Sequence, residues 1–264
     1  MRPPAGWLRW VLMSAALASA AVAVLALIAL SGSPSAGALA HNPYLDPGAR
    51  LSGRPAPDVT LTDQSGRRVS LRSYRGKVVM LAFTDAECTT VCPLTTVAML
   101  DAQRMLGRAG SRVQLLGIDA NPSATSVKDV LNYTEVHGML GRWRFLTGAL
   151  PALRRVWREF GVAAGMQHGS ITHTPALVVI DPQGRLQALY LTQQSYSAVG
   201  QLAQLVAREA SRLLPGHPRV RSDLPYSVVP EITPAQTATV PSTTGIAEPR
   251  MVATSVRLWA RRRL

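Results

Sequence analysis

The feature that most constrains this chain is a strand-like apolar run that leads directly into a loop with two cysteines. Residues 78–83, Val-Val-Met-Leu-Ala-Phe, form a continuous apolar run, which is typical of a strand covered on both faces of a sheet. Cys88 and Cys92 follow in a short polar loop, and they are the only cysteines in 264 residues. Pro93 and a stretch of helical apolar spacing come next. Because both cysteines fall in one loop, we expect them to act as a pair.

Further strand-like and helix-like segments alternate along the middle of the chain. Residues 181–184, Asp-Pro-Gln-Gly, have the composition of a tight turn between two late strands. This order predicts an α/β fold of three layers with a mixed sheet. Ser123 is the expected N-cap of the second helix. The expected strands are 77–83, 113–118, 143–146, 176–180 and 186–191, and the expected helices are 94–106, 123–137, 149–160 and 195–214.

The N-terminal part of the chain has the pattern of a membrane anchor. Residues 10–30 carry no charge, and about twenty such residues are enough to cross a bilayer as a helix. Arginines in residues 1–9 favour a cytoplasmic N-terminus, with the rest of the chain on the extracytoplasmic side of the cell membrane. The alternative is a cleaved signal peptide, because residues 38–40, Ala-Leu-Ala, have the small-x-small form. Residues 31–51 read as a linker, and either interpretation exports the domain.

The C-terminal part changes composition after residue 214. Residues 215–264 are rich in Pro, Thr, Ser, Ala and Val without a period, and we predict a disordered tail. The folded domain is therefore expected over residues 52–214.

The net charge of +13 raises the question of nucleic-acid binding. A basic recognition surface needs clustered lysine and arginine, ideally with exposed aromatic side chains for stacking. Arginine is instead spread thinly along the chain. We therefore predict no nucleic-acid partner.

The cysteine pair has three possible uses: electron exchange, metal binding or a structural disulfide. Residues four apart lie on one face once the chain turns helical, so both sulfurs can point to one spot. The helix N-terminus favours thiolate, the form that attacks disulfides and binds soft metals. A disulfide would close a very small loop and stabilise little. Outside the cytoplasm the pair would oxidise unless a metal or a thiol reductant partner prevented it.

One histidine is the best candidate to join the two sulfurs. Two thiolates suit Cu(I), and an imidazole would complete a trigonal site. His173 directly precedes the strand expected at 176–180, which we expect to neighbour the cysteine strand at the same end of the sheet. The other histidines have less favourable positions: His41 in the linker, His137 at a helix end, His168 in a loop and His217 in the tail.

These motifs resemble the Sco/SenC family of membrane-anchored, thioredoxin-fold proteins that help to assemble the copper site of cytochrome c oxidase. The resemblance rests on Cys88-x-x-x-Cys92-Pro93 before a helix, on His173, and on the Asp-Pro-x-Gly turn that begins eight residues later at Asp181. It covers roughly residues 52–213. It implies a thioredoxin-like three-layer fold, copper held by both cysteines and His173, and the oxidase copper-site subunit as partner.

Other features keep a second function open. The segment before the first cysteine is longer than the family's usual Thr-x-Cys, and Thr174-Pro175 resembles the Thr-Pro that thioredoxins place, with a cis bond, beside their redox cysteines. The alternative is a membrane-tethered thiol–disulfide oxidoreductase, in which Cys88 attacks and Cys92 resolves the mixed disulfide. A peroxidase of the peroxiredoxin type is a weaker third interpretation, because only the spacing of Thr84 and Cys88 supports it.

Overall fold

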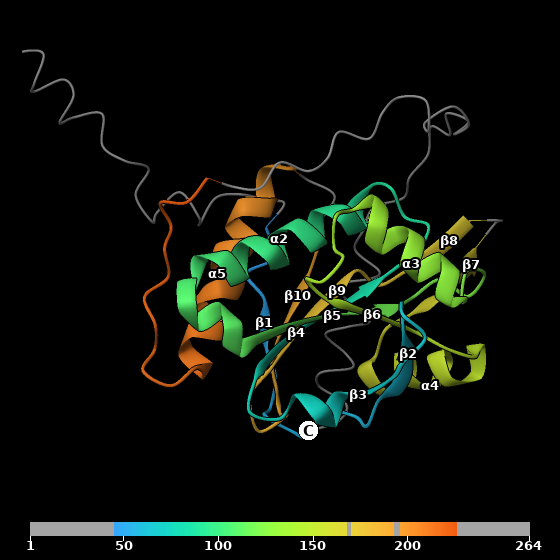
Figure 1. The fold of residues 1–264 in the computed structure, drawn as a ribbon, viewed down its shortest axis with the longest axis horizontal. Helices are drawn as coiled ribbons and strands as arrows, with labels where there is room; N and C mark the ends of the chain where they lie inside the picture. The colour runs from blue at the N-terminus through green and yellow to red at the C-terminus, as the bar shows by residue number, and fades with distance from the viewer. Residues whose placement is uncertain (1–44, 168–169, 193–195, 226–264) are drawn as a thin grey trace, which may run out of the picture. The chain divides into compact units, whose positions relative to one another are not determined.

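The computed structural model describes residues 45–167, 170–192 and 196–225 (Figure 1). Within these residues, a mixed sheet of eight strands forms the centre of the domain, in the order β1-β10-β9-β4-β5-β6-β2-β3. The three central strands β4, β5 and β6 are parallel, and the other strands of this sheet pair antiparallel. The strands are β1 (Ala49–Arg50), β2 (Thr60–Asp63), β3 (Arg68–Ser70), β4 (Val78–Thr84), β5 (Val113–Asp119), β6 (Arg144–Thr147), β9 (Ala176–Ile180) and β10 (Leu186–Leu191).

Helices cover both faces of this sheet, which gives the expected three layers. One face carries α2 (Val91–Met105), α3 (Val127–Val136) and α5 (Tyr196–Leu213), and the other carries α4 (Leu150–Phe160) with the short 3-10 helix η2 (Leu71–Tyr74). A second 3-10 helix, η3 (Gly107–Arg112), leads from α2 into β5. This arrangement is a thioredoxin-like α/β fold, so the predicted fold class of the domain is confirmed.

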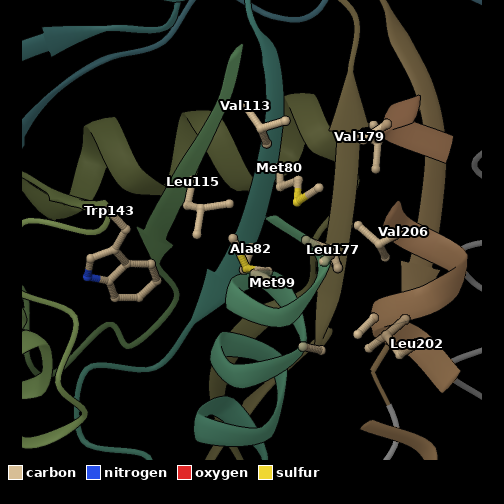
Figure 2. Close-up of a cluster of buried hydrophobic side chains, with 14 of the residues drawn as sticks. Met80, Ala82, Met99, Val113, Leu115, Trp143, Leu177, Val179, Leu202 and Val206 are labelled. Carbon is tan, nitrogen blue, oxygen red and sulfur yellow. The ribbon is translucent and has the colours of Figure 1, made fainter. Parts of the chain in front are cut away.

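The apolar run of β4 is continuous because the strand has a core on each side. Met80 and Ala82 point into the core under α2 and α5, where they join Met99, Leu202 and Val206 (Figure 2). Their neighbours Val79, Leu81 and Phe83 point into the core under α4. Successive side chains of a strand alternate between faces, so a strand buried on both faces shows no polar alternation.

Two helices begin at other residues than predicted. α2 begins at Val91, ahead of Pro93, because a proline is tolerated in the first turn, where its missing N–H needs no partner. α3 is capped by Ser126, which forms a capping box with Asp129, and the expected cap at Ser123 is wrong. Ser123 lies instead in a turn, where its N–H donates to Asn121 Oδ1 over 2.7 Å.

A two-stranded hairpin that the sequence did not predict precedes β9. It consists of β7 (Ala164–Gln167) and β8 (Ser170–His173), which pair antiparallel with each other and form a separate small sheet. The hairpin carries His173 at its end.

The ordered domain extends beyond both predicted boundaries. Ala49 and Arg50, placed in the expected linker, pair with Leu189 and Ala188 of β10. Beyond residue 214, Ser211 Oγ donates to the Pro218 carbonyl over 2.6 Å, and the N–H of Arg221 donates to the Met105 carbonyl over 2.9 Å. The first residues of the expected tail are therefore attached to α2 and α5.

The predicted transmembrane helix at 10–30 lies outside the described residues, as do residues 1–9, most of the linker and residues 226–264. Among the residues that are described, no helix has the length and apolar character needed to span a membrane.

Candidate metal and redox site

The sheet topology brings the cysteine loop and His173 to one end of the sheet. β4 runs into the cysteine loop, and β9 pairs antiparallel with β4, with Leu177 opposite Ala82. The start of β9 therefore lies beside the end of β4. His173, the last residue of β8, lies just before β9 and so at the same end of the sheet. This neighbouring of the two strands was expected from the sequence.

The cysteine loop is a compact turn that is stabilised by hydrogen bonds to Asp85, the first residue after β4. The side chain of Asp85 accepts from the N–H of Glu87 over 2.8 Å, and its carbonyl accepts from the N–H of Cys88 over 3.2 Å. Cys88 is partly buried at the end of this turn, whereas Cys92 is only 4% exposed in the first turn of α2. Both cysteines are free thiols in this structure.

The two thiols differ strongly in acidity. A hydrogen bond from the Cys92 side chain, together with backbone N–H groups of Cys92 and Thr90, lowers the pKa of Cys88 to about 5 against the opposing effect of burial. The N–H of Cys92 lies 3.5 Å from Cys88 Sγ. The same side-chain hydrogen bond, and then burial, raises the pKa of Cys92 well above its ordinary value. Cys88 is thus the thiolate of the pair and Cys92 the protonated thiol.

His173 presents one ring nitrogen to the buried thiol. Its Nε2 lies 3.7 Å from Cys92 Sγ, and its Nδ1 lies 3.3 Å from the carbonyl oxygen of Thr174. A carbonyl oxygen can only accept, so this contact requires the proton on Nδ1. The other ring nitrogen, Nε2, is directed at Cys92. Thr174 is itself fixed, because its N–H donates to the Ala163 carbonyl and its hydroxyl accepts from the Ala163 N–H.

The structure brings His173 to the Cys92 thiol and the Cys88 sulfur to the Cys92 N–H, but the three side chains do not form a closed ligand set. Across the described ranges, no three His, Cys, Asp or Glu side chains already stand close enough to hold a metal ion. Cys92 and His173 face each other, and Cys88 is the less buried of the two thiols.

The other histidines take no part that the structure describes. The His137 ring packs at a tilt against Tyr133 with ring centroids 4.3 Å apart, and His217 follows the end of α5. His41 and His168 lie outside the described residues.

An acidic cluster that the sequence did not predict supports the cysteine loop. Asn121 is fully buried, and its Nδ2 donates to Asp85 Oδ1 over 2.7 Å and to Glu87 Oε2 over 3.1 Å. Burial raises the pKa of the neighbouring Asp119 carboxyl to about 8, against the lowering effect of the Asn121 backbone N–H. The available signal was the polar segment 119–121, Asp-Ala-Asn, directly after a buried strand.

The Thr-Pro segment differs from the thioredoxin feature with which it was compared. No cis peptide bond occurs among the described residues, so the bond between Thr174 and Pro175 is trans. The Pro175 carbonyl accepts from both the N–H and the hydroxyl of Thr192, at 2.8 and 3.0 Å.

The thioredoxin-like fold, a dithiol at a helix N-terminus and a histidine beside the buried thiol together define the class: a thioredoxin-fold protein with a dithiol–histidine site. The family model described as SCO1/SenC matches residues 50–208, and the chain belongs to this family. The predicted family resemblance is thereby confirmed.

Two curated relatives show the range of similar proteins. The SCO1 protein homolog of Bacillus subtilis is 30% identical over 90 residues, which cover 34% of this chain and 47% of the relative. The chloroplastic peroxiredoxin Q of Oryza sativa subsp. japonica is 29% identical over 144 residues, 53% of this chain and 59% of the relative. The chain thus spans about half the length of these curated relatives.

Two solved structures share the fold. The solution structure of apo Sco1 from Thermus thermophilus is 26% identical with a TM-score of 0.52, and covers 65% of this chain and 99% of that one. The crystal structure of Arabidopsis thaliana ScoI with copper bound is 20% identical with a TM-score of 0.52, and covers 60% of this chain and 98% of that one.

Proposed function

We propose that this protein binds Cu(I) through Cys88, Cys92 and His173 and passes the ion to another protein by ligand exchange. The observation that carries the proposal is the 3.7 Å approach of His173 Nε2 to Cys92 Sγ, with Nδ1 tied to the Thr174 carbonyl. Thiolates and imidazole are the ligands that favour Cu(I) over harder ions. A ring oriented through its second nitrogen is typical of a metal ligand.

The spacing of the two facing ligands suits a trigonal ion. With metal–sulfur and metal–nitrogen bonds of about 2.3 and 2.0 Å, as in zinc sites, and an angle of about 120°, the two ligand atoms stand about 3.7 Å apart. Binding requires the Cys92 thiol to lose its proton, whereas Cys88 is a thiolate already. Copper uptake would therefore release about one proton at neutral pH, mainly from Cys92.

The membership of the SCO1/SenC family and the copper-bound Arabidopsis relative support copper as the cargo. The client would be the copper-site subunit of cytochrome c oxidase, an expectation that comes from the family resemblance. Residues 10–30 would anchor the protein in the cell membrane with its domain on the extracytoplasmic side, because this run is apolar and follows arginines.

The decisive experiment is an anaerobic Cu(I) titration of the full chain in detergent, with a competing Cu(I) chelator. We expect one Cu(I) per chain in the reduced wild type, loss of competitive binding in Cys88→Ser/Cys92→Ser, and binding weakened at least tenfold in His173→Ala, in line with the cost of losing a group at a metal site. His137→Ala is the matched control, because this histidine is also partly buried but lies against Tyr133. An affinity equal in His173→Ala and His137→Ala would refute the ligand assignment.

A second candidate function is thiol–disulfide exchange, and the acidity difference between the cysteines favours it. The Cys88 thiolate would attack a client disulfide, form a mixed disulfide and release one client thiolate. Cys92 would then attack the Cys88 sulfur and release the second client thiol, so that the client is reduced and the pair oxidised. A thiol reductant would restore the dithiol. Cys92→Ser should trap a mixed disulfide with the client and Cys88→Ser should not, and equal trapping by both variants would oppose this function.

A further inference from the structure

The hairpin that carries His173 also carries an exposed sulfur. Met166 in β7 is 54% exposed, one of three large apolar side chains so exposed among the described residues. A single exposed methionine needs no explanation by itself. The position of Met166 close to the cysteine–histidine site is the reason to consider a function for its sulfur.

The strand register places Met166 on the same face of the hairpin as His173. Ala164 pairs with His173, and Met166 pairs with Ile171. Directly opposite residues share a face, and so do residues two apart along a strand. Met166 and His173 are therefore diagonal neighbours on one face, with an expected separation of about 7–8 Å between them. This is the face from which the His173 ring reaches Cys92.

The sulfur of Met166 also contacts the loop that supports the cysteine turn. Ser123 Oγ donates to Met166 Sδ over 3.7 Å. The N–H of Ser123 donates to the side-chain oxygen of Asn121. The side-chain nitrogen of Asn121 donates in turn to Glu87, the residue before Cys88. The thioether thus lies at the rim of the site, between His173 on one side and the cysteine turn on the other.

We propose that Met166 is a transient Cu(I) ligand at the mouth of the site, a thioether that holds the ion while it enters or leaves the cysteine–histidine set. This inference rests on the proposed copper-binding function and adds a ligand to it. A thioether selects Cu(I) and carries no proton. In the exchange, a copper–thioether bond forms as the bond to a departing ligand breaks, and the oxidation state of copper does not change.

The first test is a rate measurement on Met166→Leu, which keeps the size of the side chain but removes the sulfur. Anaerobic full-length protein in detergent would be loaded with Cu(I) and mixed rapidly with an excess of Cu(I) chelator. A ligand that acts only during transfer speeds loading and removal by the same factor. We expect the removal rate measured in this way to fall about tenfold in Met166→Leu, the low end for loss of an auxiliary group at a metal site.

Thr172→Ala is the matched control. Thr172 is also exposed on the hairpin, but it pairs with Gly165 and so points to the opposite face from Met166. We expect this variant to transfer copper at the wild-type rate.

A second test detects the contact directly, with Ag(I) as the probe in place of Cu(I). In Cys88→Ser/Cys92→Ser, the methyl resonances of the eight methionines would be followed by NMR during Ag(I) addition. We expect one resonance to move, and to be the one that Met166→Leu removes. Wild-type transfer rates in Met166→Leu would overturn the inference whatever the Ag(I) result, while tight Cu(I) binding by the wild type would leave the proposed function standing. Absence of Cu(I) binding by the wild type would overturn both.

Discussion

His173 Nε2 lies 3.7 Å from Cys92 Sγ, although 81 residues separate them in the chain. The approach depends on the antiparallel pairing of β9 with β4, which sets the end of the hairpin above the first turn of α2. Because Nδ1 is tied to the Thr174 carbonyl, Nε2 is the ring nitrogen that is directed at the Cys92 thiol. The predictions below test the groups around this pair.

Cys88 should react as a thiolate far below neutral pH. Its pKa is lowered to about 5, first by the hydrogen bond from the Cys92 side chain. The alkylation rate of Cys88, followed by mass spectrometry, should rise through a midpoint near pH 5 and then level off. In Cys92→Ala, which lacks that donor, the midpoint should move upward. Identical midpoints in the two proteins would contradict the assigned cause.

Asp119 should make the domain less stable as pH rises from about 4 to 8. Burial raises its pKa in the folded protein from 3.8 to about 8, so the folded state keeps a proton that the unfolded state has lost. This contribution to stability is full below the unfolded pKa and is lost as pH rises through the folded value, at roughly 1.4 kcal/mol per unit in between. Asp119→Asn mimics the protonated acid, so the free energy of unfolding of this variant should change less with pH between about 4 and 8. The free energy of unfolding of both proteins would be measured with urea at each pH. If it falls equally in both proteins between about pH 4 and 8, Asp119 is not the group responsible.

Asn121 should be important for stability because it pairs with a buried carboxylate. Asn121→Ala removes the donor to Asp85 Oδ1 and leaves that oxygen without its side-chain partner. We expect a loss of about 1–3 kcal/mol in the free energy of unfolding. Asn132→Ala is the control, since Asn132 is exposed on α3, and it should change stability by less than about 0.5 kcal/mol. A loss of the same size in both variants would argue against a special role for Asn121.

Gly117 should tolerate no side chain. A Cβ at this position in β5 would lie 2.8 Å from ring atoms of both Trp143 and Phe145, which are fully buried. Gly117→Ala should therefore cost about 1–3 kcal/mol of stability by overpacking. A Cβ at Gly165 in β7 meets nothing within 4 Å, so Gly165→Ala is the matched control and should be near neutral. Thermal unfolding of the two variants decides the matter, and equal melting temperatures would contradict the packing argument.

The sequence predicted the central sheet well because burial on both faces leaves a clear pattern. The apolar run before the cysteine loop matches β4, and the second run matches β5. The predicted cap of α3 was wrong because both Ser123 and Ser126 precede a helical pattern. The reciprocal hydrogen bonds between Ser126 and Asp129 favour Ser126 as the cap. Such competition between neighbouring caps is decided by local geometry that composition does not show.

The two cysteines were predictable from their spacing in one loop, whereas the part of the site that joins distant segments was predictable only where it depended on strand order. His173 was selected because the strand that follows it was expected beside the cysteine strand, and that strand, β9, does pair with β4. The contact of Asn121 with Asp85 joins residues 36 apart and depends on the register of β4 against β5, which no local pattern specifies. The hairpin of β7 and β8 was missed because residues 164–167, Ala-Gly-Met-Gln, show neither a clear alternation nor β-branched residues.

The most direct test of the central claim is X-ray absorption at the copper edge of the Cu(I)-loaded, full-length protein. We predict a first shell of two sulfur atoms and one nitrogen atom in the wild type, and loss of the nitrogen in His173→Ala with both sulfurs retained. A wild-type shell that contains sulfur alone, or one that His173→Ala leaves unchanged, would contradict the account.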